Sequence, residues 1–299
     1  MLGTAAAHSD SYDPSLIERL LFRVAKKWVA GYDTDKAITA ALDSNSRGMS
    51  AILNFLGEEV VDTGAVERTV AEYVLLMELM HKRNVRGCIS AKPTQLGLAV
   101  SYDLCLQNFK KLASRAKELG QFLWIDMEST KFTEDTIAIY LQIHEQYNMT
   151  GVAIQSYLRR STSDLLHIIE HNGIVRLVKG AYHEPEEHAF TSREEVDASY
   201  LKLMKMLFES MNYFAIATHD SNMVEEAIRL SNNSNSNSKF EFQLLMGIRD
   251  ELKASLVKKG FIVAEYIPYG SQWLPYSVRR IRERKRNLLL LARSLIQQQ

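Results

Sequence analysis

The sequence predicts an α/β fold, a (β/α)8 barrel of the TIM type, and three observations carry this prediction. Eight short apolar runs of strand length recur along the chain, and each is followed by a longer stretch whose apolar residues repeat every 3.6 residues or so, about one helical turn. Eight strand–helix units close into a barrel, and nearly continuous apolar strands suit a sheet covered on both faces. An open doubly wound sheet usually carries a glycine-rich phosphate turn, and the sequence contains neither G-x-G-x-x-G nor G-x-x-x-x-G-K-S/T.

A helical segment at residues 1–46 is expected to precede the barrel, which we place at residues 47–299. Two helical patterns, at 13–31 and 33–48, are separated by Gly31, and Asp33 or Asp35 is suited to cap the second helix. A chain of 299 residues has room for two average domains, but a (β/α) barrel of this length is commonly one unit. We therefore expect one catalytic domain.

The strand-like runs follow in order through the barrel, at residues 50–56, 86–92, 121–127, 150–156, 174–180, 214–220, 240–247 and 261–270. The first is followed by a helical stretch at 65–84 and the last by one at 273–296. Between the sixth helix and the seventh strand lies the polar segment SNNSNSNS, residues 231–238, which cannot form a core. We expect this segment to be a surface connection at the N-terminal face of the barrel, away from the chemistry.

Composition narrows the class of protein. Lys plus Arg equals Asp plus Glu at 36 each, so no global field draws the chain to nucleic acid or to an anionic membrane. Two cysteines are too few for a disulfide framework or a four-ligand zinc site. No secretory signal and no run of about 18 apolar residues is present, which predicts a cytoplasmic protein. No metal is expected, because the close pair His167 and His171 falls late in a helix at the non-catalytic end.

Catalytic groups of a barrel project from the C-terminal ends of its strands, and these ends are unusually polar here. A single charged residue at a strand end can simply cap a helix or pair with a neighbour. Many polar residues at the strand ends together are therefore stronger evidence for a site than any one of them. Read in chain order, the strand ends offer Glu58 or Glu59, Lys92, Asp126, Glu128, Gln155, Arg176, Lys179, His219, Asp220, Gln243, Tyr266 and Tyr269.

Four arginines gather near the C-terminus, in the stretch PYSVRRIRER at residues 275–284. On a helix, the polar face opposite the apolar stripe carries Tyr276, Arg279, Arg280 and Glu283. Glu283 follows two of the arginines by three and four residues, within pairing distance. Three interpretations stay open: a solvent-facing salt-bridged helix, which this pattern alone favours, a nucleic-acid patch, or a clamp for a small anion such as a carboxylate.

Several segments together resemble the proline dehydrogenase family, and they fall in family order across most of the barrel. They are AKPTQLGL (91–98), IDMES (125–129), VRLVKGAY (175–182), ATHD (217–220), FEFQLLMG (240–247), YIPYG (266–270) and YSVRRIRER (276–284). The resemblance implies a barrel whose last helix lies over the mouth, and FAD-dependent oxidation of L-proline to Δ1-pyrroline-5-carboxylate. It also implies electron transfer to a quinone, with peripheral contact on the inner face of the cell membrane, and a separate pyrroline-5-carboxylate dehydrogenase, because the chain resembles the monofunctional bacterial or archaeal type.

The resemblance assigns roles residue by residue. Arg279 and Arg280 resemble the pair that holds the proline carboxylate, with Lys92 as a further cation and Glu283 as the residue that orients the arginines. Leu245, Tyr266 and Tyr276 would wall the ring, and Asp126 would support the cluster by hydrogen bonding. Lys179, Arg176 and Arg193 would neutralise the pyrophosphate of FAD. The full set of positions similar to FAD contacts is Gln155, Arg176, Val178, Lys179, Gly180, Ala181, Tyr182, Thr191, Arg193, Thr218, His219 and Gln243.

Two other functions remain as alternatives. Hydroxyproline dehydrogenase belongs to the same family, but Tyr266 crowds the ring position where a hydroxyl would sit and favours proline. A non-catalytic barrel that binds an anion or a nucleic acid through the arginine helix would give a colourless protein. The sequence departs from the family at His183, where some relatives carry tryptophan, and at the Ser/Asn-rich segment 231–238.

Overall fold

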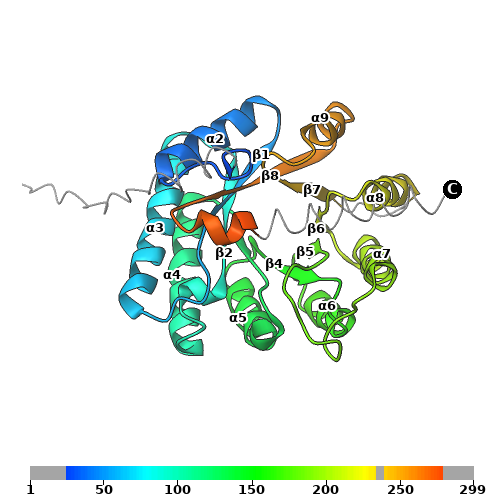
Figure 1. Cartoon of the computed structure of the whole chain (residues 1–299), viewed down its shortest axis with the longest axis horizontal. Coiled ribbons are helices and arrows are strands. Elements are labelled where there is room, and N and C mark those ends of the chain that lie inside the picture. Colours follow the sequence, from blue (N-terminus) through cyan, green and yellow to red (C-terminus); the bar gives the residue numbers. More distant parts are fainter. Residues whose placement is uncertain (1–24, 234–238, 279–299) are drawn as a thin grey trace, which may run out of the picture.

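The computed structural model describes residues 25–233 and 239–278. In this part of the chain, eight parallel strands close into a barrel in sequence order (Figure 1). They are β1 (Ser50–Phe55), β2 (Gly87–Ala91), β3 (Leu123–Ile125), β4 (Thr150–Gln155), β5 (Val175–Val178), β6 (Tyr213–Ala217), β7 (Lys239–Leu245) and β8 (Ile262–Tyr269). The barrel closes where β1 pairs with β8, with Ile52 opposite Tyr266. The predicted barrel and all eight predicted strands are confirmed.

Helices follow the strands and surround the barrel (Figure 1). They are α2 (Thr34–Ser46), α3 (Thr63–Lys82), α4 (Tyr102–Leu119), α5 (Thr133–Gln146), α6 (Ser161–Glu170), α7 (Arg193–Ser210), α8 (Ser221–Asn233) and α9 (Asp250–Lys258), with short 3-10 helices η1 (Pro93–Leu96) and η2 (Thr130–Phe132). Side chains at helix starts satisfy backbone donors that the helix leaves free: Asp62 accepts from Ala65 N, and Ser101 accepts from Leu104 N. Asp33 caps α2, one of the two caps that its sequence predicts.

The apolar side chains form two layers. Strand residues that point outward pack against the helices in the large core. Inside the barrel, a smaller cluster contains Ile52, Cys88, Trp124, Ala215 and Ala264. Gly151 makes room for the largest of these, since a Cβ atom at this position would lie 2.4 Å from the Trp124 ring. The lower barrel is therefore filled with side chains, as in other barrels of this kind, and the chemistry is left to the strand ends.

Helix α2 occupies the outer ring between α3 and α9 (Figure 1) and packs against β1 and β8. Glu265 of β8 points outward to it: its carboxylate lies 2.8 Å from the Arg47 guanidinium and 2.5 Å from the Lys253 ammonium of α9. The N-terminal helix thus fills the outer position beside the last strand. The division of the chain at residues 46 and 47 stays a prediction.

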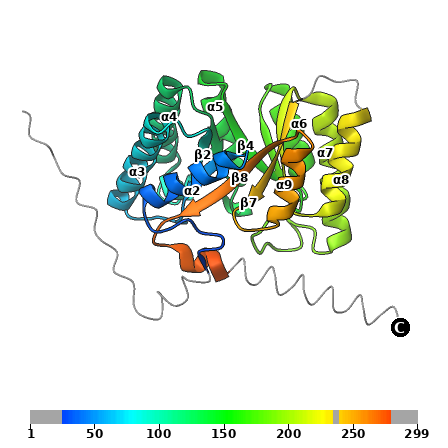
Figure 2. The ribbon, with the colours of Figure 1, turned by 90° about the horizontal axis from the view of Figure 1, so that it is seen from above.

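The chain that follows β8 leaves the ring. Residues 273–278 begin a helix that lies at the C-terminal ends of the strands (Figure 2). It is held there by a second apolar cluster, made of Ala25, Trp28, Val29, Leu56, Trp273 and Tyr276. Trp28 also donates from Nε1 to Ser277 Oγ at 3.0 Å. The predicted course of the remaining C-terminal helix, most of the first predicted helix, and residues 234–238 of the Ser/Asn-rich segment lie outside the described residues.

Candidate active site

Asp126, directly after β3, is the centre of a buried polar cluster. Its Oδ1 accepts from Arg176 Nη1 at 2.6 Å and from Ser90 Oγ at 2.7 Å. Its Oδ2 accepts from Tyr266 Oη at 2.7 Å and from Lys92 Nζ at 3.3 Å. These donors come from β5, β2 and β8, because inward-facing residues near the ends of different strands meet inside a closed barrel. The structure therefore brings together the predicted site residues Lys92, Asp126, Arg176 and Tyr266.

Two of the side chains that hydrogen-bond to Asp126, those of Lys92 and Arg176, are cations. Burial alone would raise the pKa of Asp126, but the charges of Lys92 and Arg176, with hydrogen bonds from Ser90 and Tyr266, lower it below the ordinary value. Burial opposes the charge of Lys92, yet Asp126 raises the pKa of Lys92 well above its usual range. Burial and the Asp126 charge also hold the pKa of Tyr266 far above its usual value, so the phenol stays a donor. Two cations facing one carboxylate suit an anionic ligand group.

Arg176 has hydrogen-bond donors that are not used within the described part of the chain. Only its Nη1 has a partner within the described chain, whereas Nε and Nη2 are buried without one. The guanidinium lies over the Trp124 ring, 4.5 Å from its centroid, and over the Tyr266 ring at 5.6 Å. Buried guanidinium donors are costly to leave unpaired, so this arrangement fits a ligand with acceptor atoms. The sequence grouped Arg176 with two other cations at the pyrophosphate, but its contacts place it in the Asp126 cluster.

Lys179 and Arg193 form a separate charged group beside the mouth. Lys179 Nζ lies 2.5 Å from the Asp197 carboxylate and 2.7 Å from that of Asp220. Arg193 approaches the same two carboxylates, each at 3.4 Å. Burial would raise the pKa of Asp220, but the hydrogen bond and charge of Lys179 lower it instead. Both cations are thus already neutralised, and a bound phosphate would have to share them with two carboxylates.

The backbone after β5 is shaped by Gly180. Its φ of +111° is one that residues with a side chain rarely adopt, and a Cβ atom would lie 2.1 Å from the Tyr157 ring. Beyond it, Ala181 is exposed and Tyr182 is half-buried. Tyr182 Oη donates to Glu58 Oε1 at 3.3 Å, which joins the loops after β5 and β1. The glycine therefore allows the chain to turn across the mouth of the barrel.

Two buried glutamines offer acceptors at the ends of β4 and β7. Gln155 Nε2 donates to Met127 O at 3.4 Å, and Gln243 Nε2 donates to Glu241 Oε1 at 2.5 Å. The Oε1 atom of each glutamine is buried and has no partner in the described part of the chain. Together with the open donors of Arg176, these atoms fit a flat cofactor rich in nitrogen and oxygen, such as a flavin.

Most of the remaining predicted residues lie at strand ends or in the loops that follow them. Leu245 N donates to His219 Nε2 at 3.0 Å, which leaves the imidazole proton of His219 on Nδ1. Thr218 is buried, and its hydroxyl accepts from Asp220 N at 3.1 Å. Val178 and Leu245 are half-buried, and Thr191 is exposed. Tyr276 lies in the apolar cluster with Trp28, whereas Arg279, Arg280 and Glu283 lie outside the described residues.

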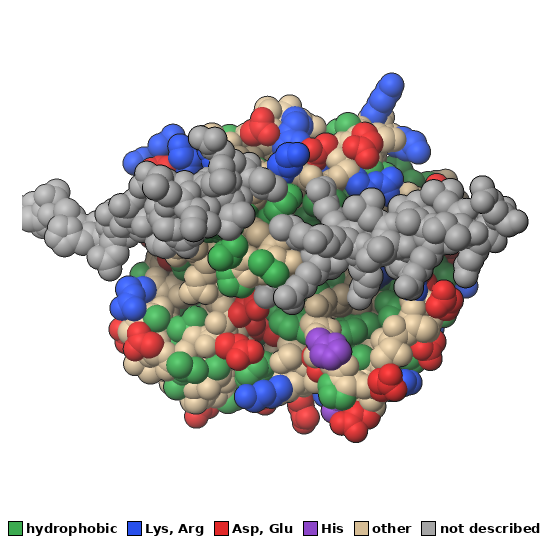
Figure 3. Space-filling model, viewed as in Figure 1, with side chains coloured by type: hydrophobic (Ala, Val, Ile, Leu, Met, Phe, Trp, Pro, Cys, Tyr) green, Lys and Arg blue, Asp and Glu red, His purple; other side chains and the backbone are tan. Residues whose placement is uncertain are grey.

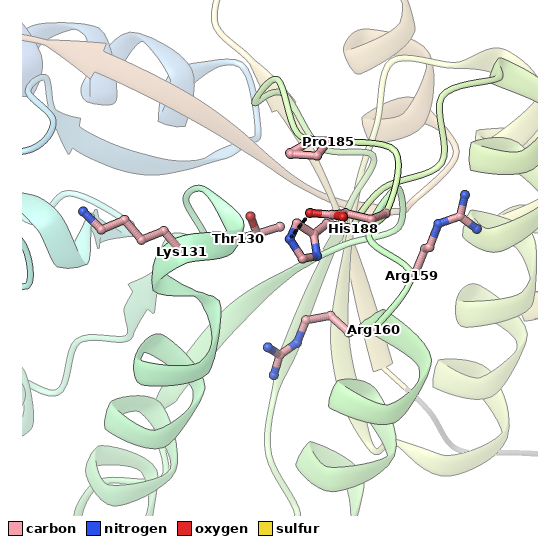
Figure 4. Close-up of a pocket in the computed structure, with 7 residues that line it drawn as sticks. Thr130, Lys131, Arg159, Arg160, Pro185 and His188 are labelled. Atoms are coloured by element: carbon pink, nitrogen blue, oxygen red, sulfur yellow. Dashed lines mark ion pairs between the residues drawn. The ribbon is translucent and has the colours of Figure 1, made fainter.

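A cavity of about 450 Å³ opens nearby, lined by Thr130, Lys131, Arg159, Arg160, Pro185, Glu187 and His188. Figure 4 shows Lys131 and Arg159 directed away from it. Arg160 is bound through two nitrogens to Asp164, at 2.8 and 3.0 Å. The cavity therefore presents no free cationic centre, and it shares no lining residue with the Asp126 cluster. On the face in Figure 3, the visible basic side chains of the described residues lie towards the rim.

Within the described residues, no helix has the length and apolar character needed to cross a bilayer.

Four residues that contact the site were not predicted from the sequence: Ser90 and Trp124 beside the Asp126 cluster, Asp197 beside Lys179, and Glu241 beside Gln243. Three of these, Ser90, Trp124 and Glu241, lie two residues before a predicted site residue in the same strand-like run, a signal that strand periodicity offers. Asp197 lies inside α7 and has no comparable signal.

A scan of protein families matches the proline dehydrogenase model to residues 37–292. Proline dehydrogenase 2 of Bacillus subtilis is 33% identical over 265 residues, covering 88% of each protein. Proline dehydrogenase of Deinococcus radiodurans is 30% identical over 288 residues, covering 94% of this chain and 93% of that protein.

Among solved structures, proline utilization A from Bdellovibrio bacteriovorus, inactivated by N-propargylglycine, superposes with a TM-score of 0.82 at 22% identity. That match covers 88% of this chain and 33% of the larger one, so the chain spans about a third of that protein and the likeness concerns the fold. The family model spans all eight barrel strands and the Asp126 cluster, both relatives cover most of the chain, and the chain belongs to the proline dehydrogenase family.

Proposed function

We propose that this protein is an FAD-dependent proline dehydrogenase, which oxidises L-proline to Δ1-pyrroline-5-carboxylate. The observation that carries the proposal is the buried cluster around Asp126, whose two cations and open Arg176 donors suit a small carboxylate beside a flavin. Membership of the family supports the class of reaction. We therefore treat the mouth of the barrel at β2, β3, β5, β7 and β8 as the place where substrate and cofactor meet.

In the proposed reaction, proline loses a hydride from Cδ, the ring carbon bonded to nitrogen on the side away from the carboxylate, and a proton from nitrogen, and a C=N bond forms between these two atoms. When bound, FAD would supply the acceptor for the two electrons and the hydrogen that leave Cδ. The protein's part is to hold the amino acid and exclude water. Lys92, with Arg279 and Arg280 as predicted, would bind the carboxylate, and Asp126 keeps Lys92 charged and in place.

Tyr266 is the residue that we expect to select the substrate. Its hydroxyl is fixed on Asp126 at 2.7 Å, so its ring is held in one position beside the cluster. Leu245 and Tyr276 complete the proposed wall of the pyrrolidine ring. A fixed ring at this place crowds a hydroxylated substrate, which favours proline over hydroxyproline.

For the cofactor, we propose that Gln155, Arg176 and Gln243 serve the flavin ring. Lys179 and Arg193 would serve the phosphates, with Asp197 and Asp220 keeping both cations fixed beforehand. Gly180 would let the backbone approach the cofactor closely. The other predicted contacts are Val178, Ala181, Tyr182, Thr191, Thr218 and His219.

Beyond the barrel, we propose a quinone as electron acceptor, reached by peripheral contact with the inner face of the cell membrane. We also propose a separate pyrroline-5-carboxylate dehydrogenase that consumes the product. These two proposals rest on the family resemblance, and membrane pelleting with quinone-containing vesicles would test the first.

The decisive experiment is a visible spectrum of the purified protein, reconstituted with FAD, before and after L-proline. Flavin absorbance that bleaches with L-proline, and much less with hydroxyproline at equal concentration, is expected. Because the amine must be neutral for a hydride to leave Cδ, the rate of bleaching should rise between about pH 6 and pH 9. A protein that stays colourless after incubation with FAD would refute the proposal and favour a non-catalytic barrel.

Arg280→Ala tests the proposed clamp separately. It should keep the flavin spectrum while proline affinity falls by several kcal/mol, roughly 2–5, because a buried carboxylate would lose a charged partner. Arg284→Ala is the matched control from the same stretch, since its side chain has no proposed role. Equal proline affinity in both variants would remove Arg280 from the clamp.

A further inference from the structure

Glu241 is a buried carboxyl group inside the barrel that the proposed reaction leaves without a role. It lies on β7, two residues before Gln243, so the two side chains point to the same inner face of the barrel. Its exposed fraction is 8%, and Gln243 is 3% exposed. A buried charge is expensive, and an interior glutamate in this position calls for a specific contact.

The contacts of Glu241 are all inside the barrel. Its Oε1 accepts from Gln243 Nε2 at 2.5 Å, and Tyr213 of β6 lies close enough to influence its pKa. Burial raises the pKa of Glu241, and the contacts with Gln243 and Tyr213 and the positive charge of Arg176 oppose that rise only in part. The thiol of Cys88 lies close enough for Glu241 to raise its pKa as well. These neighbours of Glu241 therefore favour a hydrogen-bond acceptor at its position.

The contact fixes which end of the Gln243 amide faces the site. A primary amide has a donor nitrogen and an acceptor oxygen, and here the nitrogen donates to Glu241 Oε1. A reversed amide would bring the amide oxygen against this accepting oxygen of Glu241. With Nε2 held by Glu241, the Oε1 atom of Gln243 is the atom left over, and it is buried with no partner among residues 25–233 and 239–278.

We propose that Glu241 is a positioning residue, which holds the Gln243 amide so that its carbonyl oxygen accepts from the ring N–H of bound FAD. This rests on the proposed function, because it requires that the barrel binds a flavin. The imide N–H is the donor that the polar edge of a flavin offers, and a buried oxygen without a partner is the complement it needs. Glu241 itself touches neither substrate nor cofactor in this proposal.

The test is a double-mutant cycle on FAD affinity, measured by titrating the apoprotein with FAD in a calorimeter. Glu241→Leu and Gln243→Leu should each weaken binding by roughly 3–10-fold, about the value of one hydrogen bond. The double variant should be no weaker than either single variant, because both remove the same contact. Glu241→Gln keeps an oxygen for Nε2 and should restore affinity to within about threefold of wild type.

Additive losses in the double variant would overturn the inference while leaving the proposed function intact. A wild-type protein that binds no FAD would overturn both. If Glu241→Leu does not fold, the side-chain amide of Gln243 in 15N-labelled protein supplies a second test. Its protons should exchange slowly both without and with FAD, since Nε2 stays on Glu241. Slow exchange that appears only after FAD is added would show that the cofactor, and not Glu241, holds the nitrogen.

Discussion

Replacing Asp126 with asparagine tests whether the buried cluster depends on one negative charge. In the native protein the carboxylate lies 2.6 Å from Arg176 Nη1 and 3.3 Å from Lys92 Nζ, and the three side chains are only 9%, 4% and 12% exposed, respectively. The substitution keeps the size of the side chain but leaves two buried cations without their counter-ion. Removing one partner of a buried ion pair costs about 3–5 kcal/mol.

We therefore expect the free energy of unfolding at pH 7 to fall by about 3–5 kcal/mol in Asp126→Asn, measured by urea unfolding and circular dichroism. Glu78→Gln is the matched control. Glu78 pairs with Arg115 at 2.8 Å but is 45% exposed, and an exposed pair contributes about 0–1 kcal/mol. A loss in Asp126→Asn that is no larger than the loss in this control would refute the reasoning.

The same variant has a pH signature with a definite sign. Burial opposes the charge of Asp126, but Lys92 and Arg176 lower its pKa below the unfolded value. The stability it contributes is thus present above the unfolded pKa of about 4 and is lost as the pH falls through its lowered folded value. The difference between wild type and Asp126→Asn should be full at pH 7 and shrink below about pH 4. A difference that grows on acidification would contradict the assignment.

Three further substitutions test the rest of the mouth. Lys179→Met should weaken FAD binding at least tenfold or so, since it removes a charge-assisted contact, and an unchanged dissociation constant in calorimetry would exclude that role. Gly180→Ala, at φ +111°, should lower the free energy of unfolding by about 1–3 kcal/mol. Gly120→Ala is its control, because φ is +63° there and nothing lies within 4 Å of the new methyl group. This control should lower the free energy of unfolding by about 1 kcal/mol. Tyr266→Phe removes the 2.7 Å hydrogen bond to Asp126 and should cost about 1–2 kcal/mol in urea unfolding, with the pKa of Asp126 moving back towards its ordinary value in an NMR titration.

The strands and the charged centre of the site could be predicted because both follow short-range rules. Apolar runs and helical periods repeat along the chain, and the ends of parallel strands meet at one face of a barrel. The same rule of alternation would also have found Ser90, Trp124 and Glu241, since each lies two residues before a predicted site residue. On these three strands the site therefore extends one inward-facing residue further into the barrel than the strand ends.

Other contacts depend on pairings between distant segments that no local pattern encodes. Asp197 reaches Lys179 only because α7 packs back across β5. Tyr276 lies on the polar face of its predicted helix, yet it is buried, because Trp28 and Leu56 cover that face. A helical wheel separates apolar from polar positions, but it does not show which other segment of the chain will cover them.

The position of α2 beside β8 has a consequence for how the barrel assembles. Arg47 and Glu265 are separated by 218 residues in the chain, yet their side chains are hydrogen-bonded. They meet where β1 pairs with β8 and closes the barrel. During synthesis, the contacts of β1 and α2 with β8 can form only after nearly the whole barrel has been made. Both elements emerge early and remain without β8 until it appears. Premature termination before residue 262 would leave an open sheet with two unpaired edges, a species prone to aggregate.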